Sequence, residues 1–182
     1  MNSQDTGKQS WLPQTLLALA MIAVAAAVRI APHPWNFTPI GAMALFSGAV
    51  LRNRRLAFLF PLLALFVGDI FVGFHKLMPF VYASFAVNIA IGLWLRGRRT
   101  ISPIGLATFA GAVQFFLVTN FAVWRYFDTF PKTAAGLAAC YLAGLPFFWN
   151  TLAGDAIYAI LLFGSYAFAE RWLPAPRAAQ QL

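Results

Sequence analysis

Charged side chains are scarce in this sequence, where Asp, Glu, Lys and Arg make up 10% of 182 residues. A soluble domain is about a quarter charged. Hydrophobic residues reach 61%, more than a water-facing surface and one small core can use. These proportions argue against an ordinary soluble domain and predict an integral membrane protein.

Acidic residues and cysteine are rarer still. Five acids stand against 13 Lys and Arg, which gives a net charge of +8. The basic residues fall between apolar runs, where membrane topology demands them, so we expect no nucleic-acid partner. The single cysteine, Cys140, has no partner for an internal disulfide, and we interpret it as a packing residue. Nucleotide-binding and nucleophile motifs are also missing.

Six apolar runs alternate with short basic segments. A helix needs about 20 residues to cross the hydrocarbon core, and most of the runs approach that length. The second run has about 13 residues, which as a helix spans only about 20 Å. We predict an all-α integral membrane protein, a six-transmembrane-helix bundle with a short second span. Its spans are residues 12–31, 39–51, 56–74, 79–95, 103–124 and 147–169.

Two segments leave alternatives open. Residues 131–145 are rich in small side chains, and we predict an extra short helix there, before the last span; a seventh span is the alternative. The first run also has the features of a cleavable signal peptide, although further spans follow it. The transmembrane domain is thus expected at residues 12–173, between cytoplasmic tails at residues 1–11 and 174–182.

The basic residues predict an orientation. With the N-terminus inside, nine Lys and Arg fall on the inner side and four on the outer side, as the positive-inside rule requires. The six tryptophans all fall near ends of the predicted spans, as in the aromatic belts of membrane proteins. We therefore expect a multi-pass protein with both termini in the cytoplasm.

A proline-rich stretch at residues 32–41 lies on the expected outer side, before the short second span. It ends in Thr38-Pro39, a pair typical of a helix N-terminus with threonine as the N-cap. Because the second span is short, the preceding loop has to dip inward. We predict that this stretch, which also contains His33, is a lid with three ligand-contacting residues, Trp35, Asn36 and Phe37.

Two acidic residues fall inside predicted spans, where charge is costly and usually faces protein or a cavity. Asp69 and Asp155 each follow a glycine, and both lie in the outer half of their spans. Either they share a polar site beneath the outer face, or they serve helix packing. With other polar and aromatic residues they form the predicted substrate-binding set, His33, Trp35, Asn36, Phe37, Asp69, His75, Asn88, Asn120, Trp124, Asn150 and Asp155. For Asn88, hydrogen bonding between helices is the alternative role.

Several functions remain open on residues alone. His33 and His75 both fall in outer loops, but no H-x-x-H or paired-cysteine spacing accompanies them, so we predict no metal and no cofactor. An intramembrane enzyme acting on a lipid, with Asp69 and Asp155 as acid and base, is an alternative to ligand binding. A non-catalytic accessory membrane subunit and a proton-coupled carrier are also compatible with these residues.

Long segments of the chain are distinctive, namely residues 34–49, 61–69, 78–85, 118–124 and 145–155. They resemble an uncharacterised family of bacterial proteins assigned to transport, and the resemblance covers nearly the whole chain. It implies a location in the bacterial cytoplasmic (inner) membrane.

More loosely, the size, the six spans and the alanine-rich first helix look like the substrate-binding S component of energy-coupling-factor vitamin transporters. That resemblance implies a non-enzymatic protein that takes up a small vitamin-like ligand from the outer side. It also implies that Ala23 and Ala27 dock a transmembrane coupling subunit with separate ATPases, while solitary transport stays open. Cobalamin stays open as the ligand, although Cys140 does not occupy the third-span region where solitary cobalamin S components carry a cysteine.

Overall fold

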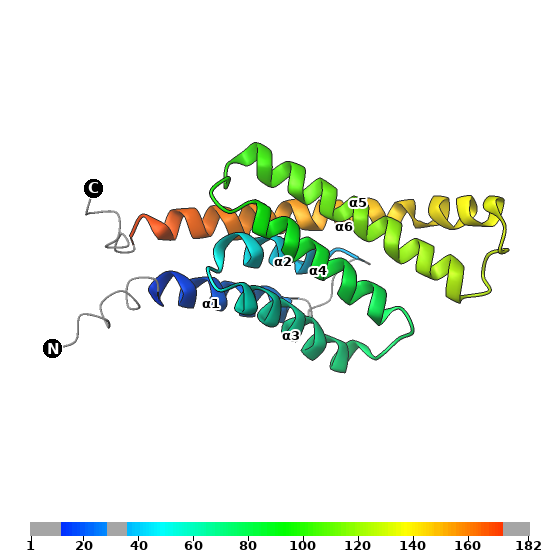
Figure 1. The fold of residues 1–182 in the computed structure, drawn as a ribbon, viewed down its shortest axis with the longest axis horizontal. Helices are drawn as coiled ribbons and strands as arrows, with labels where there is room; N and C mark the ends of the chain where they lie inside the picture. The colour runs from blue at the N-terminus through cyan, green and yellow to red at the C-terminus, as the bar shows by residue number, and fades with distance from the viewer. Residues whose placement is uncertain (1–11, 29–35, 173–182) are drawn as a thin grey trace.

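The computed structural model describes residues 12–28 and 36–172, and this part of the chain is helical without any strand. Its helices are α1 (Leu12–Val28), α2 (Ile40–Val50), α3 (Arg54–Val72), α4 (Met78–Trp94), α5 (Ile101–Tyr126) and α6 (Ala134–Glu170). Successive helices run in opposite directions along the long axis of the molecule (Figure 1). The prediction of an all-α protein is confirmed.

In the part of the chain that the structure describes, two helices, α5 and α6, are long and apolar enough to cross a membrane. They contain 26 and 37 residues, whereas about 20 residues span the hydrocarbon core. The helices α1, α2 and α4 are apolar but shorter. The two long helices pack against each other as an antiparallel pair.

One continuous helix stands where the sequence predicts two segments. The expected short helix at residues 131–145 and the expected span at residues 147–169 are both part of α6. The helix begins after Thr133, whose side chain accepts a hydrogen bond from the Gly136 N–H at 3.1 Å. Pro146 lies inside it, and a proline removes only one intrahelical hydrogen bond, so the helix continues past it. The predicted separate helix is therefore corrected.

The short helix α2 is the central element of the bundle. It contacts all five other helices, and residues 40–49 are all buried. Two glycines allow its backbone to touch that of α4. A Cβ on Gly48 would lie 2.2 Å from the Ile89 carbonyl oxygen, and a Cβ on Gly92 would lie 2.2 Å from the Leu45 carbonyl oxygen. Only glycine permits this approach at the two positions.

Arg96 binds the C-terminal end of α2. Its guanidinium donates from Nε to the Gly48 carbonyl at 3.0 Å, from Nη1 to the Arg52 carbonyl at 3.3 Å, and from Nη2 to the Leu51 carbonyl. Burial, and then the charge of Arg54, lowers the pKa of Arg96 below its ordinary value. A cation at a helix C-terminus is favoured because the carbonyls there carry partial negative charge.

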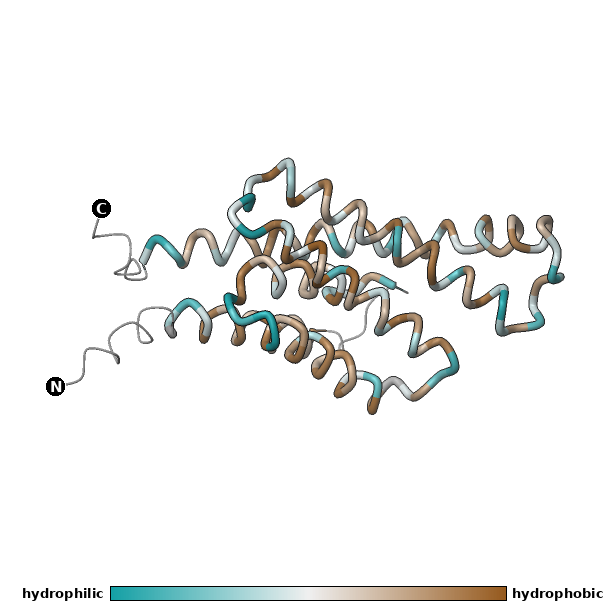
Figure 2. Tube along the Cα trace, in the orientation of Figure 1, coloured by the Kyte–Doolittle hydropathy of each residue, from teal (hydrophilic) through white to brown (hydrophobic). Residues whose placement is uncertain are grey.

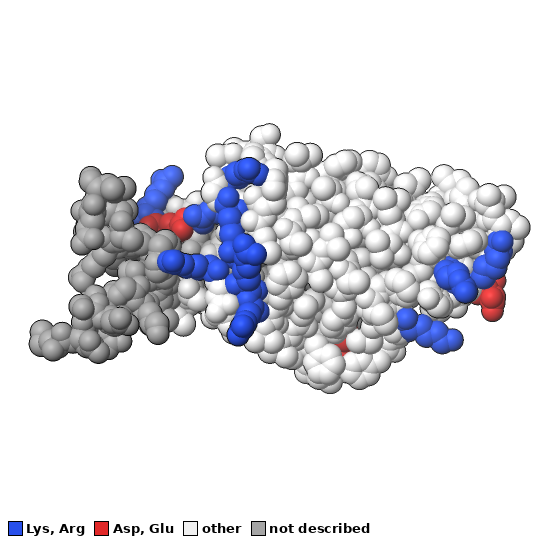
Figure 3. All heavy atoms as spheres, viewed as in Figure 1, with Lys and Arg blue, Asp and Glu red and all other residues white. Residues whose placement is uncertain are grey.

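Charge and surface polarity are concentrated at the two ends of the molecule. Figure 2 shows hydrophilic residues near both ends and a hydrophobic middle. Figure 3 shows Lys and Arg at the same two ends, with a broad band between them that is almost free of charge. In the described helices, only Asp69 and Asp155 carry charge away from helix ends. This distribution agrees with a membrane protein.

Candidate functional site

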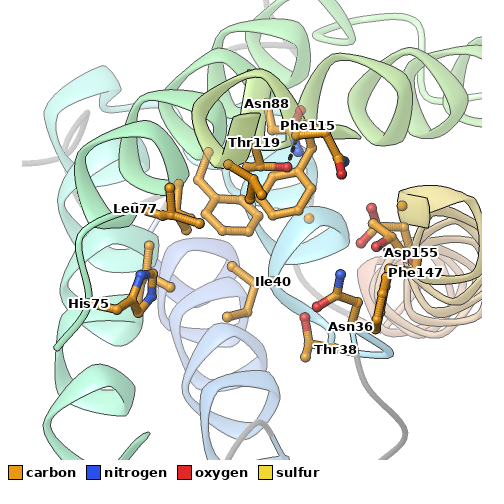
Figure 4. A pocket seen from close by; sticks show the side chains of 18 of the residues that line it. Asn36, Thr38, Ile40, His75, Leu77, Asn88, Phe115, Thr119, Phe147 and Asp155 are labelled. Atoms are coloured by element: carbon orange, nitrogen blue, oxygen red, sulfur yellow. Dashed lines mark hydrogen bonds between the residues drawn. The ribbon is translucent and has the colours of Figure 1, made fainter. Parts of the chain in front are cut away.

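A cavity of about 510 Å³ lies among the loop before α2, the α3–α4 loop and the helices α4, α5 and α6 (Figure 4). The exposed residues Asn36 and His75 line it near the loops. The buried residues Asn88 and Asp155 line it inside the bundle. The change from exposed to buried lining shows that the cavity leads from the surface into the interior.

The cavity brings together part of the predicted binding set, namely Asn36, His75, Asn88, Asn120 and Asp155. Four members of the set lie outside its lining, namely Phe37, Asp69, Trp124 and Asn150. The two remaining members, His33 and Trp35, lie outside the described residues.

The described end of the predicted lid is packed against α6. Asn36 has a φ of +60°, a left-handed conformation that asparagine tolerates better than most residues. The next ring, Phe37, lies 5.9 Å from the Tyr158 ring, centroid to centroid. The Phe37 Cα lies 3.3 Å from the position of a Cβ on Gly154. Asn36 therefore lines the cavity, whereas Phe37 anchors the loop.

Asp155 caps the N-terminus of α2 from across the bundle. Its Oδ1 accepts a hydrogen bond from the Ala42 N–H at 3.1 Å, and its side chain is 3% exposed. The N-cap residue is Pro39 and not Thr38, and no side-chain cap comes from the N-cap residue, which corrects the predicted threonine cap. A Cβ on Gly41 would lie 2.3 Å from each carboxylate oxygen. The carboxylate thus sits where unpaired N–H groups and the helix dipole favour an anion.

This cap predicts different stabilities for two substitutions of Asp155. We expect Asp155→Ala to lower the free energy of unfolding by about 1–3 kcal/mol, because the buried Ala42 N–H loses its acceptor. Asp155→Asn should retain most of the stability, since its amide oxygen accepts the same hydrogen bond. Thermal unfolding of the detergent-solubilised variants, followed by tryptophan fluorescence, measures both. An equal loss in the two variants would contradict a hydrogen-bonded cap.

Asp69 lies apart from the cavity lining. Its Oδ2 accepts a hydrogen bond from the Tyr82 hydroxyl at 2.8 Å, and the side chain is 2% exposed. The contact joins α3 to α4, which is the packing role that the sequence left open for this acid. Of the two acids within predicted spans, Asp155 alone lines the cavity.

Asn88 has both of the roles considered for it. It lines the cavity, and its Oδ1 accepts a hydrogen bond from Gln114 Nε2 at 2.9 Å. The same Gln114 nitrogen lies 3.0 Å from the Ser84 carbonyl oxygen. A Cβ on Gly111 would lie 2.8 Å from Asn88 Oδ1. This close polar contact joins α4 to α5 beside the buried end of the cavity.

Two further predicted residues differ in their positions on α5. Asn120 lines the cavity and donates from Nδ2 to the Phe116 carbonyl at 2.9 Å. Trp124 donates from its indole nitrogen to the Pro131 carbonyl at 2.8 Å, so it holds the α5–α6 loop. Asn150 lies on α6 with a half-buried side chain.

The predicted binding set left out the aromatic and hydroxyl-bearing part of the wall. Phe115 and Thr119 of α5 line the cavity, as do Phe147 and Thr151 of α6. Both pairs have a spacing of four residues, and Asp155 continues the second series by one more turn. Residues four apart share one face of a helix. That spacing is the signal by which these residues could have been found.

No group of three His, Cys, Asp or Glu that could hold a metal ion is found within residues 12–28 and 36–172. Figure 4 shows His75 and Asp155 on opposite sides of the cavity. Cys140 is buried and also lines the cavity. The lining is therefore mostly apolar, with amides, hydroxyls, one imidazole and one carboxylate.

A separate apolar groove of about 360 Å³ lies between α1 and α3. The two predicted docking residues, Ala23 and Ala27, both line it, and both are exposed. Phe60, Leu63 and Val67 of α3 line the groove as well. The sequence pattern thus coincides with a surface depression that no described part of the chain fills.

Comparison with known proteins gives one match. The model of a family of unknown function, DUF6580, matches residues 9–176. No protein of curated function and no solved structure matches the chain.

Proposed function

We propose that this chain, which belongs to the DUF6580 family of unknown function, is an integral membrane substrate-binding protein for uptake of a small vitamin-like nutrient. The cavity of about 510 Å³ carries the proposal, because it leads from exposed loops to buried polar groups. Sites for small organic ligands are typically concave, about 300–1,000 Å³ in volume, mostly apolar and furnished with a few polar groups. The cavity has each of these properties.

The proposal includes six membrane-spanning helices. The lengths of α5 and α6 support it, as does the band almost free of charge between the two basic ends (Figure 3). The helix α2 has only 11 residues, which at 1.5 Å per residue is about half the thickness of the hydrocarbon core. Because the other helices enclose it, its ends need not reach both membrane surfaces.

The orientation in the proposal follows the distribution of basic residues. The α2–α3 and α4–α5 connections and the helix ends beside them hold a cluster of six arginines, Arg52, Arg54, Arg55, Arg96, Arg98 and Arg99. The positive-inside rule places this end in the cytoplasm. The loops that line the cavity connect the opposite ends of the helices (Figure 1). We thus propose a bacterial inner-membrane protein with cytoplasmic termini and an outward-facing cavity.

The likeness to S components adds a proposed partner. The exposed groove that Ala23 and Ala27 line between α1 and α3 would receive a transmembrane coupling subunit, whose ATPases are separate chains. Small side chains allow close approach of two helices within a membrane. We propose this contact as the route by which ATP hydrolysis is coupled to uptake.

The function is tested by filling the cavity with a larger side chain and measuring the small molecules that remain bound to the protein. Ala143 is an exposed residue of α6 that lines the cavity, and Ala139, one turn earlier, is exposed and lies outside it. We expect small molecules to co-purify with the unaltered protein and with Ala139→Phe, and to fall at least about tenfold in Ala143→Phe, where a phenyl ring occupies their space. Mass spectrometry of the denatured samples measures them. The proposal fails if nothing co-purifies, or if Ala143→Phe retains as much as Ala139→Phe.

A further inference from the structure

The charges around the cavity favour a positively charged ligand. Among the residues that the structure describes, its lining contains the carboxylate of Asp155 and no Lys or Arg. The imidazole of His75 lies across the cavity near the exposed loops (Figure 4). An anionic ligand group at the buried end would be repelled by Asp155, and two like charges 4 Å apart interact by about 4 kcal/mol at an effective dielectric constant of 20. A cationic group there would be attracted by a similar amount.

The carboxylate of Asp155 retains hydrogen-bonding capacity. A carboxylate has about four lone-pair sites, and within the described residues Asp155 receives one hydrogen bond, from the Ala42 N–H. The side chain is 3% exposed and lines the cavity. A buried carboxylate oxygen without enough hydrogen-bond donors costs free energy. A ligand that donates a hydrogen bond to it therefore gains more binding free energy than it would at the surface.

Neighbouring side chains present further acceptors. The Thr119 hydroxyl donates to the Phe115 carbonyl at 2.7 Å, and the Thr151 hydroxyl donates to the Phe147 carbonyl at 2.9 Å. A hydroxyl that has given its hydrogen to its own helix can only accept from a ligand. The Asn120 amide donates one of its two N–H groups to its own helix at 2.9 Å, and its oxygen remains an acceptor. The wall formed by α5 and α6 thus matches a ligand rich in N–H groups.

The remaining lining favours a ligand with an apolar body, which is a property of an organic cation. Phe115 and Phe147 flank the polar groups of α5 and α6, and aromatic faces attract cations as well as apolar surface. The described residues contain no cluster of acidic, histidine and cysteine side chains that could hold a metal ion. One carboxylate among phenylalanines is therefore suited to a protonated nitrogen compound and not to a bare metal ion.

We infer that the cavity binds an organic cation, in which a protonated nitrogen donates to Asp155 and an apolar or aromatic body lies against the phenylalanines of α5 and α6. This inference rests on the proposed function and names the chemical class of its ligand. Asp155 is the residue that selects this class, because it supplies the charge at the buried end of the cavity.

The first experiment removes the charge of Asp155 and preserves the fold. Asp155→Asn keeps an acceptor for the Ala42 N–H, and Glu170→Gln is the matched control, a carboxylate on the same helix that pairs with Arg99 at 3.3 Å near the other end of the molecule. We expect a basic nitrogen compound to be released from the unaltered protein and from Glu170→Gln. At least about tenfold less should be released from Asp155→Asn, because the acceptor loses the negative charge that attracts the cation and strengthens its hydrogen bond. Size-exclusion chromatography confirms that both variants are folded.

The second experiment uses three probes of one shape and different charge, 2-phenylethylammonium, 2-phenylethanol and phenylacetate. A ligand that binds the folded state stabilises it by RT ln(1 + [L]/Kd), so at equal concentration the probe that binds most tightly raises the thermal unfolding temperature most. We expect the ammonium probe to give the largest rise in the unaltered protein and in Glu170→Gln, and that rise to be lost in Asp155→Asn. No rise with the ammonium probe, or an equal or larger rise with phenylacetate, overturns the inference.

The outcomes separate the two proposals. If a released molecule lacks a basic nitrogen, or if Asp155→Asn retains it, the organic cation is wrong while substrate binding stands. If the unaltered protein releases nothing, or if Ala143→Phe binds the probes as well as Ala139→Phe does, the cavity is not a binding site and both proposals fail.

Discussion

Gly92→Ala is expected to destabilise the protein by about 3 kcal/mol or more, because the added methyl group would overpack the centre of the bundle. Its Cβ would lie 2.2 Å from the Leu45 carbonyl oxygen, which belongs to the backbone of α2. A backbone atom cannot rotate away as a side chain can, so α2 and α4 would have to separate. Every other helix contacts α2, and the separation would disturb all of them. We expect a marked loss of monodisperse protein in size-exclusion chromatography and a lower thermal unfolding temperature.

Two other helical glycines serve as controls. They test whether the loss comes from the close contact at Gly92 or from replacing any glycine in a helix. Gly105 in α5 and Gly164 in α6 have no heavy atom within 4 Å of an added Cβ. Alanine at either position should be neutral or stabilise the protein by about 0.5–1 kcal/mol through helix propensity. If Gly92→Ala behaves like Gly105→Ala and Gly164→Ala, the close approach of α2 to α4 is not required for the fold.

Arg96→Met should have the second-largest effect, a loss of about 2–4 kcal/mol, because hydrogen bonds from a charged donor at a helix C-terminus disappear together. The carbonyls of Gly48, Leu51 and Arg52 would lose their donor at the end of α2. Arg96→Lys should recover part of this stability, since lysine keeps the charge but lacks the planar fork of donors. Thermal unfolding of the three proteins in one detergent measures the series.

Arg98 provides the control for Arg96. It lies two residues further on and is exposed, with its guanidinium 4.9 Å from the centre of the Trp94 ring. Arg98→Met should cost only about 0.5–1 kcal/mol, the size of an exposed cation–π contact. A loss as large as that of Arg96→Met would mean that general charge at this end, and not the cap on α2, is responsible.

These contacts explain how a helix of 11 residues keeps its place in the centre of the bundle. Asp155 from α6 binds its N-terminal end, and Arg96 from the segment after α4 binds its C-terminal end. An anion and a cation at those ends complement the helix dipole in the stabilising direction. Because Asp155 also lines the cavity, the same side chain that fixes α2 is available to a ligand.

The helices themselves could be predicted from local sequence. The apolar run at residues 79–95 corresponds to α4 at Met78–Trp94, and the short run at residues 39–51 corresponds to α2 at Ile40–Val50. Such runs and their basic or glycine-containing boundaries act within a few residues along the chain, so they are visible without a fold. The predicted boundary between residues 145 and 147 falls at Pro146, which lies inside α6. A proline inside a helix and a proline between two helices look alike in sequence.

The sequence by itself determined the helical class, the apolar runs, the shortness of α2 and the polar residues most worth testing, because each depends on composition or on neighbours along the chain. Only the tertiary structure decided which of those residues share a cavity. The hydrogen bond between Asp155 and Ala42 joins residues 113 positions apart, while Asp69, equally prominent in sequence, pairs with Tyr82 outside the cavity lining. The two acids look alike along the chain, and the packing of their helices gives them different partners.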